Sequence, residues 1–99
     1  MRTQFIVKEK DTSKRRDFYH YIKNKYKFEI HFPYYEKYFI NYVFPFVIDF
    51  KEKSFWICDS ITCLACAAQE KVIIGIDEFY EQEKELLKIK KYRKLLLDK

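Results

Sequence analysis

A chain of 99 residues has room for one domain with one core. Its single Gly excludes Gly-rich phosphate-binding loops. Ten Phe, nine Tyr and one Trp predict an aromatic core whose hydroxyl groups must find hydrogen-bond partners or reach solvent. The net charge of +5 is unevenly spread: residues 1–28 carry nine basic and three acidic side chains, residues 29–83 four and ten, and residues 84–99 seven and two. Basic ends around an acidic middle allow the termini to dock on the body of the chain or on a second copy.

The first half of the chain predicts two strands and a helix. Residues 3–8 alternate in polarity, which predicts a short strand, and the polar residues 11–13 offer N-caps for a helix that ends at about Lys25. Residues 27–32 alternate again and predict a half-buried strand. The spacing in residues 34–43 favours a short helix, whereas their β-rich composition favours a strand, and both alternatives stay open.

The second half predicts a hairpin and two further helices. Residues 44–60 form the hairpin, with a charged turn at residues 51–53 that lacks Gly and is therefore longer than two residues. A short helix to residue 69 and a strand at residues 72–74 follow, and Gly75 precedes a long helix over residues 76–97. The whole chain is thus predicted to be a single α+β domain, residues 1–99, with a small mixed or antiparallel sheet, an N-terminal helix, a short middle helix and a long C-terminal helix.

The apolar stripe of the C-terminal helix changes sides partway along. At about 100° per residue, Phe79 and Leu86 lie on one side of the helix, together with Tyr80 and Leu87. A second apolar group lies on the opposite side. This pattern predicts that the helix first packs on its own domain and then partly projects to form a homodimer. The predicted self-association residues are Ile89, Tyr92, Leu95 and Leu96.

The three cysteines do not complete a metal site. Cys58, Cys63 and Cys66 have the spacing Cys-x4-Cys-x2-Cys of plant-type [2Fe-2S] ligands, but the chain has no fourth Cys and no Gly-rich loop. Zinc would need His20 or His31 as a further ligand, and neither lies in a paired-ligand motif. The favoured interpretation is three small buried side chains, with no metal and no cofactor.

No pattern in the chain points to catalysis. His20 and His31 are the side chains that titrate near neutrality, and each has an ordinary core or surface explanation. The serines Ser13, Ser54 and Ser60 lie outside any Gly-x-Ser-x-Gly motif. We therefore expect a noncatalytic protein, not an enzyme.

Binding of nucleic acid is the alternative function. Lysines and arginines at both ends of the chain would contact phosphates if the two ends converge, and exposed tyrosines would stack on bases. The candidate contact residues are Lys14, Arg15, Arg16, Tyr26, Tyr34, Tyr35, Lys90, Lys91, Arg93 and Lys94.

The location of the protein is predicted from absent signals. No stretch of 18 apolar residues predicts a transmembrane helix, and the amino terminus lacks the apolar run of a secretory signal. We expect an intracellular protein, or a virion component assembled inside a cell, with no membrane as partner.

The chain resembles the small proteins of filamentous and rod-shaped double-stranded DNA viruses that infect hyperthermophilic archaea. The resemblance rests on the short, Gly-poor composition rich in Lys, Tyr, Phe and Ile, on residues 34–50 and 55–69, and on the charged helix from Ile76. The composition of the chain is also similar to that of small proteins of bacteriophages with AT-rich hosts. The resemblance implies a thermostable viral interaction protein of the host cytoplasm, often dimeric, that binds DNA or a host or viral protein.

Overall fold

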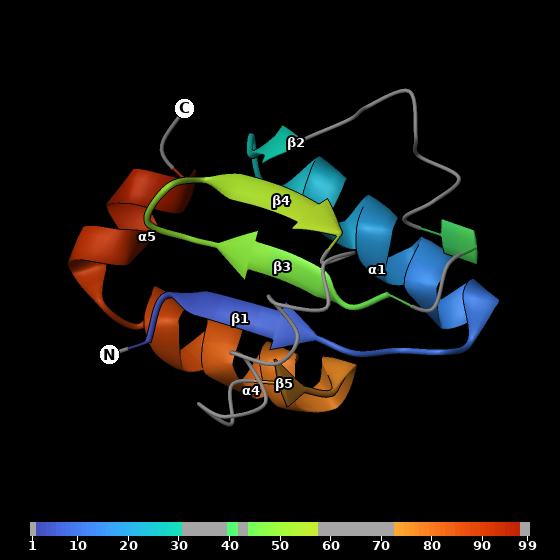
Figure 1. Cartoon of the computed structure of the whole chain (residues 1–99). Helices are drawn as coiled ribbons and strands as arrows, with labels where there is room; N and C mark the ends of the chain where they lie inside the picture. Colours follow the sequence, from blue (N-terminus) through green and yellow to red (C-terminus); the bar gives the residue numbers. More distant parts are fainter. Residues whose placement is uncertain (1, 31–39, 42–43, 58–72, 98–99) are drawn as a thin grey trace.

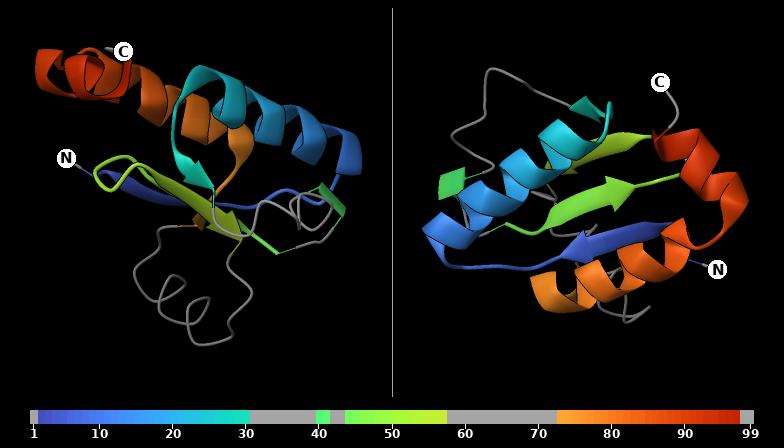
Figure 2. Two further views of the ribbon diagram at one scale, coloured as in Figure 1. Left: turned by 90° about the horizontal axis from the view of Figure 1, so that it is seen from above. Right: turned by 180° about the vertical axis from the view of Figure 1, so that it is seen from behind.

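In the described part of the chain, helices α1, α4 and α5 cover one face of a five-stranded sheet (Figures 1 and 2). The computed structural model describes residues 2–30, 40–41, 44–57 and 73–97. The predicted α+β class is confirmed. The strands are β1 (Gln4–Val7), β2 (Glu29–Ile30), β3 (Phe46–Asp49), β4 (Ser54–Ile57) and β5 (Ile73–Ile74). The helices are α1 (Thr12–Lys25), α4 (Ile76–Leu87) and α5 (Lys90–Leu97).

The sheet is mixed, with the strand order β2-β4-β3-β1-β5. Strand β3 runs antiparallel to both of its neighbours, β1 and β4, whereas the edge strands β5 and β2 run parallel to β1 and β4. The register pairs Phe5 with Ile48 and Ile48 with Phe55. Because directly opposed residues share one face of a sheet, this row of large apolar side chains points at the helices.

The hairpin of β3 and β4 follows the prediction of a charged turn longer than two residues. Its turn covers residues 50–53, and the backbone amide of Glu52 donates to Oδ1 of Asp49 over 3.0 Å. Lys53 adopts a φ of 54°, the left-handed conformation that the missing Gly would otherwise supply. The predicted hairpin is confirmed.

The N-terminal strand and helix were also predicted correctly. Asp11 caps α1, and its side chain accepts a hydrogen bond from the backbone amide of Lys14 over 2.9 Å. The helix buries Phe18, Tyr19 and Ile22 against the sheet.

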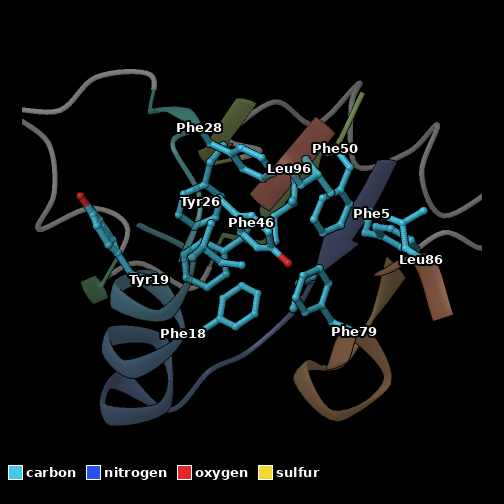
Figure 3. Close-up of a cluster of buried hydrophobic side chains, with 14 residues drawn as sticks. Phe5, Phe18, Tyr19, Tyr26, Phe28, Phe46, Phe50, Phe79, Leu86 and Leu96 are labelled. Atoms are coloured by element: carbon cyan, nitrogen blue, oxygen red, sulfur yellow. The ribbon is translucent and has the colours of Figure 1, made fainter. Parts of the chain in front are cut away.

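Phenylalanine rings from the sheet and from both long helices meet in one core (Figure 3). Phe79 of α4 stands edge-on to Phe18 of α1, with ring centroids 5.2 Å apart, and edge-on to Phe5 of β1 at 6.0 Å. It stacks on Phe50 at 6.0 Å. Full burial of one such side chain contributes roughly 1.5 to 3 kcal/mol, so Phe79 is a central anchor between α4 and the sheet.

The predicted single helix over residues 76–97 is wrong, because the chain forms two helices. The backbone amides of Lys88 and Ile89 donate to Glu85 and Leu86, a tighter pattern than that of an α-helix, and α5 starts at Lys90. Leu96 is consequently 8% exposed and belongs to the core of its own domain. A straight helix with apolar residues on two opposite faces buries only one of them on a single core, whereas a bend lets both faces reach it.

Several predicted elements lie outside the described residues. They include the short middle helix to residue 69 with Cys58, Cys63 and Cys66, and most of the segment 34–43. Ile40 and Asn41 of that segment are helical.

Truncation of Leu96 tests whether α5 packs on its own domain. We expect Leu96→Ala to lower the free energy of unfolding by about 2 to 5 kcal/mol, because a buried leucine leaves a cavity. Leu95→Ala is the matched control, since Leu95 is 39% exposed on the same helix and its truncation should have little effect. Denaturant unfolding followed by circular dichroism measures both. A loss for Leu96→Ala that appears only at high protein concentration would show instead that Leu96 lies between two copies.

Candidate functional site

The outer face of α5 carries a cluster of exposed cations. The inward side of α5 carries Leu96, which is buried, and Tyr92, which packs against the core. Ile89, in the turn before the helix, is half-buried. Lysine and arginine side chains therefore occupy the solvent side. They are Lys90, Lys91, Arg93 and Lys94, and all four are exposed.

Two further segments bring positive charge to the same end of the molecule. The amide of Phe50 donates to the carbonyl of Thr3 over 2.8 Å, which fixes the amino terminus beside the β3–β4 turn. Figures 1 and 2 place this turn, the amino terminus and α5 at one end of the sheet. We call this region the basic end, and its cations are Arg2, Lys51, Lys53, Lys88, Lys90, Lys91, Arg93 and Lys94.

Few carboxylates oppose these cations in the described residues. Glu85 pairs with Lys88 at 2.9 Å, and Glu52 and Asp49 lie at the turn, where Oδ1 of Asp49 accepts from the Glu52 amide. Glu29 is bound to the turn through its backbone amide, which donates to the carbonyl of Lys53 over 2.8 Å. The basic end therefore has a clear excess of positive charge, which attracts anionic partners over a distance of about 10 Å at moderate salt.

The predicted nucleic-acid residues of the N-terminal helix do not join the basic end. Lys14 and Arg16 are exposed near the start of α1, and both ribbon views place this start at the opposite end of the molecule from α5 (Figures 1 and 2). Lys14 and Arg16 thus do not form one surface with the cations of α5. Tyr26 is 3% exposed and has no free ring face for a base, while Tyr34 and Tyr35 lie outside the described residues.

Arg15 is a core residue, so the prediction that it contacts nucleic acid is wrong. It is 1% exposed, its Nε donates to the carbonyl of Ile40 over 3.2 Å, and its Nη1 donates to the carbonyl of Glu9 over 2.9 Å. The guanidinium lies 4.3 Å from the centroid of the Phe46 ring. Burial lowers the pKa of Arg15 to about 10, and the nearby charge of Glu9 partly offsets this. At neutral pH the side chain is a buried cation that joins α1 to β3.

Sequence reasoning missed a buried carboxylate between α1 and α4. Glu83 is 4% exposed, and its oxygens accept hydrogen bonds from the hydroxyls of Tyr21, over 2.6 Å, and Tyr26. The Nζ of Lys25 lies 3.3 Å from Glu83 and donates to the Tyr21 hydroxyl over 2.8 Å. The signal was present, because Phe79, Glu83 and Leu86 share one face of α4 at helical spacing.

The cluster of Glu83, Tyr21, Tyr26 and Lys25 keeps the two tyrosine hydroxyls protonated, so neither is an activated nucleophile. Burial, together with the hydrogen bond and the charge of Glu83, raises the pKa of both Tyr21 and Tyr26 well above its ordinary value. Tyrosines with raised pKa values stay protonated donors at neutral pH, so the geometry fits a structural role in joining two helices.

Of the histidines and cysteines considered as metal ligands or acid-base groups, only one lies within the described residues. His20 of α1 is half-buried, and its ring stands 5.3 Å from that of Tyr19. Cys58, Cys63, Cys66 and His31 lie outside the described residues. Within the described part of the chain, no three His, Cys, Asp or Glu side chains are placed to hold a metal ion. None of the helices described there is long and apolar enough to cross a membrane.

Comparison of the chain with known protein families, with characterised proteins and with solved structures finds no match.

Replacement of Tyr26 tests the structural role of the Glu83 cluster. We expect Tyr26→Phe to lower the free energy of unfolding at neutral pH by about 1.5 to 3 kcal/mol, because it removes a hydrogen bond to a buried carboxylate. Urea unfolding measures the loss. Tyr92→Phe on α5 is the control and should change the stability much less.

The same variant should change the stability profile at high pH. The ordinary tyrosine pKa is 10.0 and the folded-state pKa of Tyr26 is higher, so this group stabilises the fold below about pH 10, and the contribution is lost as the pH rises further. Tyr26→Phe should therefore lose stability less steeply above pH 10 than the unmodified protein. Arg15, whose pKa is lowered, acts in the opposite direction but equally in both proteins. Identical slopes above pH 10 would contradict the assignment.

Proposed function

We propose that the protein is a noncatalytic binding protein whose basic end contacts the phosphate backbone of nucleic acid. The observation that carries this proposal is that the cations of α5 share one end of the fold with the β3–β4 turn and the amino terminus. These segments are distant in sequence, and folding alone brings them together. A cluster of exposed lysines and arginines on one face is the electrostatic signature of phosphate binding.

The dimensions of α5 suit a phosphate backbone. Its eight residues span roughly 12 Å, at 1.5 Å per residue. Duplex DNA carries about one charge per 1.7 Å of its axis, so several phosphates lie within the length of this helix. Lys90 and Lys94 are four residues apart and project from the same side, where they can contact neighbouring phosphates together.

The described residues favour contacts with phosphates over contacts with bases. Tyr26 is buried, and Tyr92 is partly buried against the core with the Nζ of Lys91 5.7 Å from its ring centroid, so neither is an open stacking platform at the basic end. Base stacking requires such a face. The proposed binding is therefore insensitive to base sequence and strongly sensitive to salt.

The structure gives less support to the stable apolar homodimer predicted from the C-terminal helix. Of the predicted residues, Leu96 is buried in its own domain, Tyr92 packs against the same core and Ile89 is half-buried. Leu95 and the neighbouring Leu97 remain exposed. Two leucines fall far short of the roughly 800 Å² per partner that a stable interface buries. The resemblance to viral proteins concerns the origin of the chain and stays a hypothesis.

A double alanine variant on α5 tests the proposal. We expect Lys90→Ala with Lys94→Ala to weaken binding to a short labelled DNA duplex, because two phosphate contacts are lost. A plot of log affinity against log salt should become shallower by about 2, since each contact contributes about 0.9. Fluorescence anisotropy over a series of salt concentrations measures both quantities.

Lys14→Ala with Arg16→Ala is the matched control, because it removes two exposed cations from the opposite end. Its affinity and salt slope should stay close to those of the unmodified protein. Equal losses in the two variants would show that only net charge matters. No binding of the unmodified protein at low salt would overturn the proposal.

A further inference from the structure

Three large apolar side chains are exposed in the described part of the chain, and they lie on oppositely charged helices. Leu95 and Leu97 are 39% and 41% exposed on α5, beside the cations of the basic end. Tyr80 is 36% exposed on α4. Apolar contacts bordered by charge are the usual composition of a protein interface. Leu95 and Leu97 are two residues apart on α5, so they border its cations from different sides.

The exposed charges around Tyr80 are mostly acidic, and Lys84 lies one turn further along α4 on the same side. The exposed positions of α4 include four carboxylates and Lys84 as the one basic residue, and the carboxylates are Asp77, Glu78, Glu81 and Glu85. The charges of Asp17 on α1 and of Asp77 contribute to raising the pKa of the Tyr80 hydroxyl, behind burial and Glu83, so both lie near the ring. We call Asp17, Asp77, Tyr80 and Glu81 the Tyr80 surface.

The ring of Tyr80 is held in a fixed position. It stands edge-on to Tyr21, with centroids 5.1 Å apart, and to Phe18 at 6.1 Å. Tyr21 is in turn held by Glu83. A partner that contacts Tyr80 therefore pays little conformational entropy on this side of the interface.

We infer that the Tyr80 surface of one copy binds the basic end of a second copy, with Leu95 against the Tyr80 ring. Charge complementarity supports this pairing, because carboxylates outnumber the one lysine among the exposed positions of α4, whereas the exposed charged side chains of α5 are all basic. Among the described residues, none of the four cations of α5 forms an ion pair within its own chain. The Nζ of Lys91 lies 5.7 Å from the centroid of the Tyr92 ring, whereas Lys90, Arg93 and Lys94 are available to a partner.

The two surfaces are different, so the contact is head to tail rather than two-fold symmetric. Each bound pair still presents one free surface of each kind, and a contact of this type builds an open series of copies. The apolar area is small, so the association is weak and falls as salt rises. Nucleic acid would compete for the basic end, but the association itself does not require that nucleic acid binds.

Two variants, each defective at one surface, test the inference. Asp77→Asn with Glu81→Gln removes two of the three carboxylates of the Tyr80 surface, and Lys90→Ala with Lys94→Ala weakens the basic end. In sedimentation equilibrium at low salt, we expect the mass of the unmodified protein to rise with concentration beyond that of a dimer. Each variant alone should stay monomeric, with unchanged circular dichroism as the folding control.

An equimolar mixture of the two variants is the decisive sample. The intact basic end of one variant should bind the intact Tyr80 surface of the other, so the mass should rise to that of a dimer and stop there. A mixture that stays monomeric while the unmodified protein associates would overturn the head-to-tail contact. An unmodified protein that is monomeric at every concentration would overturn the association itself.

Failure of this inference is distinguishable from failure of the proposed function. The variant Asp77→Asn with Glu81→Gln leaves the basic end intact, so it should bind the labelled DNA duplex at least as tightly as the unmodified protein does. Loss of self-association with retained DNA binding supports the inference, whereas unchanged self-association in this variant overturns it.

Discussion

The buried carboxylate of Glu83 is the constraint on which the arrangement of the helices depends. An ion in an aromatic core costs several kcal/mol unless donors surround it, and here the donors come from a different helix. The hydroxyls of Tyr21 and Tyr26, together with Lys25, place the end of α1 against the middle of α4. Apolar packing alone tolerates small shifts of one helix along another, whereas a carboxylate with fixed donors does not. The cluster therefore selects one register for two helices that the Phe rings would otherwise hold less specifically.

The bend between α4 and α5 follows from the same core. With α4 fixed by Phe79 and Glu83, a straight continuation would carry the second apolar face, with Tyr92 and Leu96, away from the sheet. The tightened turn at Lys88 and Ile89 instead brings α5 back, and Leu96 joins the buried cluster that includes Phe28 and Phe50. An apolar stripe that changes sides along a helix thus has two solutions, a second partner or a bend, and this chain adopts the bend.

Local patterns in the sequence predicted much of the described secondary structure, but they did not predict contacts between distant residues. Alternating polarity predicted β1, and the polar residues before α1 predicted its cap at Asp11. A charged segment between two apolar runs predicted the hairpin. Each of these signals lies within a few residues of the element that it specifies. Tyr21 and Tyr26 reach Glu83 from 62 and 57 residues away, and no local spacing records such a contact. The prediction for Arg15 was wrong for a related reason. Exposed Lys14 and Arg16 flank it in the sequence, and composition does not distinguish a buried cation from exposed neighbours.

The charge pattern of the C-terminal helices has a structural cause that precedes any binding role. Carboxylates such as Asp77 and Glu78 in the first turn of α4, and Lys94 in the last turn of α5, each stabilise a helix end through its dipole. If the two helices were one, these charges would lie along a single rod. The bend keeps α4 beside α1 and moves α5 to the end of the sheet, so helix-stabilising charges become two separate surfaces of opposite sign (Figure 2). The step that completes the core therefore also concentrates the cations of α5 beside those of the turn and the amino terminus.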